Sequence, residues 1–116
     1  KRKHISFEEC LEYDFVGLNR GSSLLELTSR NAEKLGKQMR LRIQVRSYDA
    51  MCQMIAVNLG IGVLPLQACA AQIKALDLKA IALDDSWAKR NLLLATKSNS
   101  TQPPAAALLS QHLLAQ

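Results

Sequence analysis

Residues 41–46 alternate between aliphatic and polar side chains, and this period of two predicts a strand with one buried and one solvent-facing side. The assignment puts Leu41, Ile43 and Val45 on the buried side and Arg42, Gln44 and Arg46 on the solvent side. Residues 48–57 are apolar almost all round, which predicts a helix covered on two sides. Residues 61–64 then form a short apolar run, as expected of a buried strand.

The residues between these segments predict where the helix begins and ends. Ser47 can cap the start of the helix through its hydroxyl group. Asn58 and Gly60 both tolerate a positive φ, so they predict a left-handed turn at the helix end. Residues 41–65 therefore predict a strand, a helix, a tight turn and a second strand.

Similar patterns predict strands and helices along the rest of the chain. We expect a helical or loop approach over 7–13, strands over 14–18, 79–83 and 90–97, helices over 21–36, 66–76 and 104–116, and a turn at 84–86. Strands that alternate with helices are typical of α/β proteins. The sequence therefore predicts an α/β fold with a mostly parallel sheet flanked by helices.

The composition is that of an ordinary globular domain, with 48% hydrophobic and 22% charged residues. Much of the net charge of +5 lies in two clusters, residues 1–4 and 37–46. Aromatic residues are only 4% of the chain, so we interpret these clusters as a basic terminus and a solvent-facing strand rather than a nucleic-acid surface. The densest apolar run, residues 92–95, is far too short to cross a membrane.

The chain shows no constellation of residues for catalysis or metal binding. No serine lies in a G-x-S-x-G motif, and neither His4 nor His112 has an acidic or thiol partner at metal-ligand spacing. Cys10, Cys52 and Cys69 are odd in number and lie in apolar patterns, which indicates reduced core thiols. We therefore expect a protein that is not an enzyme and that has no cofactor and no metal.

Residues 58–65, with the sequence NLGIGVLP, resemble the end of a β-α-β unit in the regulatory domain of LysR-type transcriptional regulators. Asn58 stands where that family usually has its first glycine. The resemblance extends upstream to residues 13–18 and 21–24, which are similar to the first strand and helix of the family's second regulatory subdomain. It extends downstream to residues 87–97 and the expected last helix.

The resemblance implies a periplasmic-binding-protein-like (type 2) regulatory subdomain. Residues 1–88 would be the second subdomain of the effector-binding domain, and residues 89–116 a C-terminal strand and helix that return to the first subdomain. The winged helix-turn-helix DNA-binding domain of the family would lie outside this chain. The strand over 90–97 and the helix over 104–116 would then lack their usual sheet partners, so we expect a homo-oligomer, with these elements as candidates for exchange between chains.

The resemblance also implies a function in the cytoplasm. A small-molecule effector would bind between the two subdomains and favour their closed arrangement, and DNA would be contacted only through the absent helix-turn-helix domain. Two alternatives stay open. The chain could be a solute-binding protein of the same fold, or an oligomerisation module whose apolar helix over 48–57 is a subunit interface.

Strand-to-helix junctions are the candidate ligand-binding positions, because ligands of open α/β sheets bind beyond the carboxyl ends of the strands. Free N–H groups and the helix dipole at such junctions favour an anion such as a carboxylate. The predicted effector contacts are Ser47 with its neighbours Arg46 and Tyr48, then Ser22 and Ser23, then Pro65. In the family, the junction that matches Ser47 is a recurring effector contact. The alternative interpretation is that the serines are only helix caps, that Arg46 only faces water and that Tyr48 packs against the sheet.

Overall fold

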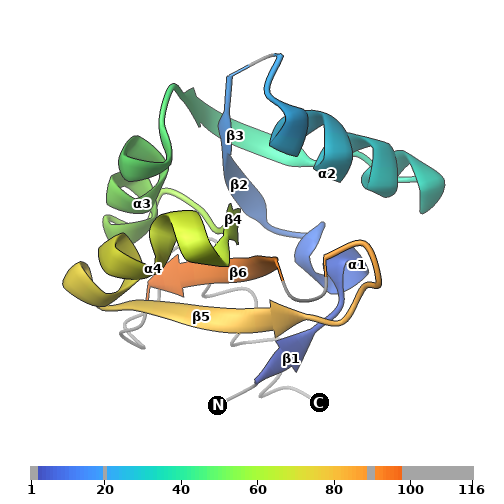
Figure 1. The fold of residues 1–116 in the computed structure, drawn as a ribbon. Coiled ribbons are helices and arrows are strands. Elements are labelled where there is room, and N and C mark those ends of the chain that lie inside the picture. Colours follow the sequence, from blue (N-terminus) through green and yellow to red (C-terminus); the bar gives the residue numbers. More distant parts are fainter. Residues whose placement is uncertain (1–2, 20, 89–90, 98–116) are drawn as a thin grey trace.

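Six strands and four helices follow one another in the residues that this computed structural model describes, 3–19, 21–88 and 91–97 (Figure 1). The strands are β1 (His4–Ile5), β2 (Asp14–Leu18), β3 (Arg40–Val45), β4 (Gly62–Pro65), β5 (Leu78–Leu83) and β6 (Leu92–Lys97). The helices are α1 (Phe7–Cys10), α2 (Ser23–Lys34), α3 (Tyr48–Ala56) and α4 (Leu66–Ala75). The α/β fold is confirmed, and the two-residue strand β1 is an addition that the sequence pattern did not predict.

The sheet is mixed rather than mostly parallel, which corrects the prediction. Strands β1, β5, β6 and β4 form one sheet in that order, and β2 and β3 form a second. The pairs β1–β5 and β2–β3 are parallel, whereas β6 is antiparallel to both of its neighbours. A parallel return requires a crossover of about a dozen residues or more, usually a helix. Residues 84–91 are too few for such a crossover, so the chain turns back beside β5.

Strand β6 lies inside the sheet and has a hydrogen-bonded partner on each side (Figure 1). Leu94 stands opposite Val63 on β4 and Ile81 on β5, and residues 93–96 are buried. The strand expected over 90–97 therefore has sheet partners within this chain, and its exchange between chains stays a prediction. The expected helix over 104–116 lies outside the described residues. The assignment of residues 1–88 and 89–116 to two family subdomains stays a prediction.

A close contact between β2 and β4 joins the two sheets. The Val16 N–H donates to the Ile61 carbonyl at 2.8 Å, and the Ile61 N–H donates to the Asp14 carbonyl at 3.0 Å. Gly60 permits this approach, since a Cβ atom there would lie 2.9 Å from the Asp14 carbonyl oxygen. Gly60 is thus needed because the two strands come so close together, and not because of a positive φ. Asn58 does adopt the predicted left-handed conformation, with a φ of 70°.

A β-bulge at Arg42 interrupts the alternation predicted for β3. Phe15 stands opposite Leu41, but the next residue of β2, Val16, stands opposite Ile43, so Arg42 has no partner. Because a one-residue shift turns the following side chains to the other face, Leu41 and Ile43 point to opposite sides. Ile43 packs with the core around α3, whereas Leu41 lies outside that cluster and is 36% exposed. The prediction that the aliphatic residues of this strand share one buried side is therefore wrong.

Helix α3 is the predicted apolar helix, and it is covered on two sides. It packs against the sheet and against α4 (Figure 1), and its buried side chains are Met51, Cys52 and Ile55. The Ala50 N–H donates to the Ser47 hydroxyl oxygen at 3.0 Å, so the predicted cap is confirmed. These three side chains pack inside the chain. The alternative of this helix as a subunit interface stays a prediction.

Replacing Gly60 with Ala should lower the free energy of unfolding by about 2–3 kcal/mol, because the added methyl group meets backbone atoms of Asp14 and Phe15 at 2.9–3.3 Å. Gly17→Ala is the matched control. The added methyl group meets the flexible end of the Leu41 side chain, which can move aside. The free energy of unfolding should therefore fall by less than about 1 kcal/mol. Urea denaturation of both variants measures the difference, and equal losses would contradict the role given to the β2–β4 contact.

Candidate functional site

Three strand-to-helix junctions lie at one edge of the molecule. Leu18 at the end of β2 stands opposite Val45 at the end of β3, and the Asn19 N–H donates to the Val45 carbonyl at 2.8 Å. Ile61, the residue before β4, forms a parallel bridge with Phe15 of β2, so the chain enters β4 in the direction of β2. The carboxyl ends of all three strands therefore point the same way, and helices α2, α3 and α4 begin beyond them. This is the end at which open α/β sheets bind ligands.

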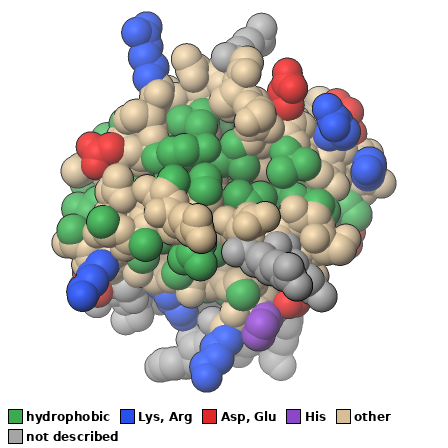
Figure 2. Space-filling view, in the orientation of Figure 1, with side chains coloured by type: hydrophobic (Ala, Val, Ile, Leu, Met, Phe, Trp, Pro, Cys, Tyr) green, Lys and Arg blue, Asp and Glu red, His purple; other side chains and the backbone are tan. Residues whose placement is uncertain are grey.

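An open groove of about 510 Å³ lies among these junctions, within the size range of small-molecule sites. Its apolar and aromatic lining consists of Leu24, Leu27, Tyr48, Pro65, Trp87 and Leu92. Its polar lining consists of Ser23, Glu26, Arg30 and Asn91. Figure 2 shows hydrophobic side chains gathered in the middle of one face, with charged side chains toward its outline. An apolar surface surrounded by polar groups is typical of a ligand or partner site.

The structure brings three of the predicted contacts together. Ser23 at the start of α2, Tyr48 at the start of α3 and Pro65 at the end of β4 all line the groove. These residues are far apart in the sequence and come from three different junctions. The groove therefore joins the junctions that the sequence analysis singled out separately.

The other three predicted contacts lie next to the groove but are not part of its lining. Ser22 caps α2, since the Leu25 N–H donates to its hydroxyl oxygen at 3.0 Å, and Ser47 caps α3 in the same way. Arg46 is exposed at the end of β3. The capping role of the two serines is therefore confirmed, and a ligand contact by any of these three residues stays a prediction.

Two aromatic side chains shape the groove. Burial and the neighbouring Cys69 raise the pKa of Tyr48, so its phenol stays protonated and can donate a hydrogen bond to a ligand. The Trp87 ring packs edge-on against Phe7, with ring centroids 5.0 Å apart and an interplanar angle of 89°. This packing anchors Trp87 in the turn before β6 and fixes its position in the groove wall.

Most of the groove wall was missed from the sequence. Ser23, Glu26, Leu27 and Arg30 line it from one helix, at the i, i+3, i+4 and i+7 spacing of a single helical face. The sequence analysis predicted this helix over 21–36 but gave a binding role only to Ser22 and Ser23, and Leu27 is half-buried. The sequence did carry one signal of an open groove. This face of the helix combines a leucine with a serine and two opposite charges, which is unusual for a buried face.

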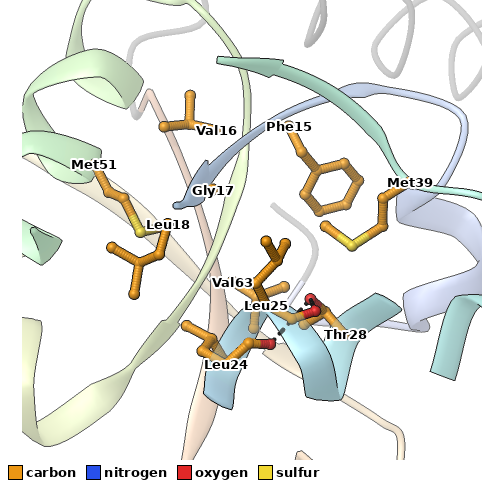
Figure 3. Close-up of a pocket in the computed structure, with 10 residues that line it drawn as sticks. All are labelled: Phe15, Val16, Gly17, Leu18, Leu24, Leu25, Thr28, Met39, Met51 and Val63. Carbon is orange, nitrogen blue, oxygen red and sulfur yellow. Dashed lines mark hydrogen bonds between the residues drawn. The ribbon is translucent and has the colours of Figure 1, made fainter. Parts of the chain in front are cut away.

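A second cavity lies between β2, α2 and neighbouring elements, and it measures only about 10 Å³ (Figure 3). Its lining is almost entirely apolar. Thr28 is the exception, and its buried hydroxyl group is hydrogen-bonded to the Leu24 and Leu25 carbonyl oxygens, each at 3.1 Å. The volume is close to that of one water molecule, so this cavity is a packing gap and not an effector site.

The family model for the LysR substrate binding domain matches residues 1–116. The chain belongs to the LysR substrate-binding domain family. No curated protein and no solved structure matches it. LysR substrate-binding domains have a periplasmic-binding-protein-like fold and bind effectors in LysR-type regulators of transcription, so the resemblance inferred from residues 58–65 and their flanks is confirmed.

The described part of this LysR substrate-binding domain offers little other chemistry. Residues 3–19, 21–88 and 91–97 contain no group of three or more His, Cys, Asp or Glu side chains that could hold a metal ion. None of the described helices is long and apolar enough to cross a membrane. Cys10, Cys52 and Cys69 are buried and form no disulfide bond with one another, so their predicted place in the core is confirmed.

Two of these thiols face each other between α3 and α4. Cys52 and Cys69 are hydrogen-bonded to each other, and burial raises the pKa of both. Burial raises the pKa of Cys69 to about 12, and the neighbouring Cys52 adds to the shift. Because the thiolate is the reactive form, both cysteines should resist alkylation in the folded protein.

We expect the free energy of unfolding to fall as the pH rises from about 9 toward about 12. The pKa of Cys69 in the folded state lies above its ordinary value of 9.0, so in this range the unfolded chain releases the thiol proton while the folded chain keeps it. Cys69→Ala should reduce this slope, and urea denaturation at several pH values measures it. Equal slopes for the variant and the wild type would show that this thiol ionises equally in both states.

Proposed function

We propose that the groove binds a small carboxylate-bearing metabolite, and that this chain is the effector-sensing part of a cytoplasmic LysR-type regulator. One observation carries the proposal: residues from three strand-to-helix junctions, Ser23, Tyr48 and Pro65, line a single groove. Membership in a family of effector-binding domains supports it. The groove's apolar wall and few polar groups are also the usual composition of a small-molecule site.

The polar groups of the groove suit a carboxylate. The hydroxyl groups of Ser23 and Tyr48 can each donate a hydrogen bond, and the Arg30 guanidinium supplies a positive charge. The starts of α2 and α3 add backbone N–H groups and a favourable dipole. Ser22, Arg46 and Ser47 remain predicted contacts for a ligand that extends past the groove toward the end of β3.

The proposed mechanism is a shift between conformations. The groove would form one wall of the effector cleft, and the first regulatory subdomain would form the other wall. An effector that contacts both walls favours the closed arrangement, because it interacts more strongly with that arrangement than with the open one. In a homo-oligomer, closure changes how the subunits present their DNA-binding domains.

This function requires no enzymatic step. One alternative is a solute-binding protein of the same fold, since it would use the same junctions to hold a metabolite. The other alternative is an oligomerisation module without a ligand. The match to the LysR family favours the regulator.

A thermal-shift screen against small carboxylic acids and aromatic metabolites tests the proposal. A specific ligand should raise the Tm by several degrees. Each kcal/mol that binding adds to the free energy of unfolding raises the Tm by about 4 °C or more. Ser23→Ala and Tyr48→Phe should reduce that rise, because each removes a hydroxyl donor from the groove. Ser29→Ala and Tyr13→Phe are the matched controls, since neither residue lines the groove, and the rise should persist in both.

The same screen separates the two roles of Ser47. If Ser47 only caps α3, Ser47→Ala lowers the Tm without ligand, at a cost of about 1 kcal/mol, and leaves the ligand-induced rise unchanged. If Ser47 also contacts the ligand, the rise shrinks as well. A screen in which no compound raises the Tm, or in which the control variants lose the rise as fully as the groove variants do, would contradict the proposed function.

A further inference from the structure

Two opposite charges line the groove one helical turn apart. Glu26 and Arg30 are both exposed on α2 and both belong to the groove lining. At i, i+4 spacing their Cβ atoms are about 5–6 Å apart. Among the residues that the structure describes, neither side chain forms an ion pair, whereas Lys37 pairs with Glu8 and Arg40 pairs with Asp14. Both charges are thus available to a ligand.

The same groove presents apolar side chains beside these charges. Leu27 lies beside Arg30 on the same face of α2, at i, i+3 spacing. Trp87 lines the groove from the turn before β6, and Leu92 lines it from the first residue of β6. A ligand that fills the groove therefore meets one negative group, one positive group and an apolar wall. A simple carboxylate would satisfy Arg30 but would place its own negative charge near Glu26.

We infer that the groove selects an α-amino acid with an apolar side chain. The ligand carboxylate pairs with the Arg30 guanidinium, its ammonium group pairs with the Glu26 carboxylate, and its side chain packs on Leu27, Trp87 and Leu92. The inference rests on the proposed function, since it specifies the ligand of the same groove. The close spacing of ammonium and carboxylate in an α-amino acid suits two side chains one helical turn apart.

A ligand series tests the inference on the wild-type chain. Isothermal titration compares leucine and phenylalanine with their deaminated acids, 4-methylpentanoate and 3-phenylpropanoate, and with their decarboxylated amines, isopentylamine and 2-phenylethylamine. One of the two amino acids should bind at least about tenfold more tightly than both of its analogues, since a charge-assisted hydrogen bond contributes about that factor. Equal affinity of an amino acid and its deaminated acid would overturn the inference.

Variants assign each charge to its role. Glu26→Gln should abolish the preference for the amino acid over the deaminated acid, because the ammonium group loses its partner. Arg30→Gln should abolish the preference over the amine for the equivalent reason. Glu33→Gln and Lys34→Gln are matched controls on the same helix, since both residues are exposed and outside the groove, and they should leave both preferences intact. Preferences that survive Glu26→Gln and Arg30→Gln would overturn the assignment.

Failure of this inference is distinguishable from failure of the proposed function. In one outcome, the deaminated acids raise the Tm, this rise depends on Ser23 and Tyr48, and the amino acids bind no more tightly than the acids. The groove is then an effector site for simple acids, and only the inference is wrong. If no amino acid, acid or amine binds, the inference is wrong, and the proposed function then loses its ligand class as well.

Discussion

The contact between β2 and β4 determines the geometry of the whole site. Two backbone hydrogen bonds, of 2.8 and 3.0 Å, join the two sheets at Ile61, and they form because Gly60 has no Cβ atom to hold the strands apart. This contact aligns the carboxyl end of the β2–β3 pair with that of β4. As a consequence, three helices begin around one groove. Without the contact, the two sheets would hold separate halves of the site.

The sequence predicted local structure well, because local structure depends on neighbouring residues. The cap at Ser47 and the left-handed turn at Asn58 follow from the chemistry of those single residues. The bulge at Arg42 and the insertion of β6 between β4 and β5 depend instead on register and on pairing between distant strands. A pattern of hydrophobic positions carries no such information, and that is why the strand face and the mostly parallel sheet were wrongly predicted.

The candidate site shows the same division. The junctions were predicted from general behaviour of α/β sheets, but the serines found there already serve the helices as caps. The groove wall comes from one face of α2 and from Trp87, which reaches the site because its ring is held against Phe7. These contributions arise from packing across long sequence separations. The composition of the groove is the reason why we propose a ligand with an apolar body beside its charged groups, a narrower class than the carboxylate-bearing metabolite predicted from the helix starts.

Residue-resolved amide NMR during a titration with a ligand found by the thermal-shift screen tests the central claim most directly. If three junctions form one site, the signals of residues 21–24, 46–49 and 65–66 should shift together, with a single dissociation constant. Signals of β1 and of the central part of β5 should stay unchanged, since these strands lie away from the groove. Shifts confined to one junction, or to the sheet edge at β1, would contradict the account.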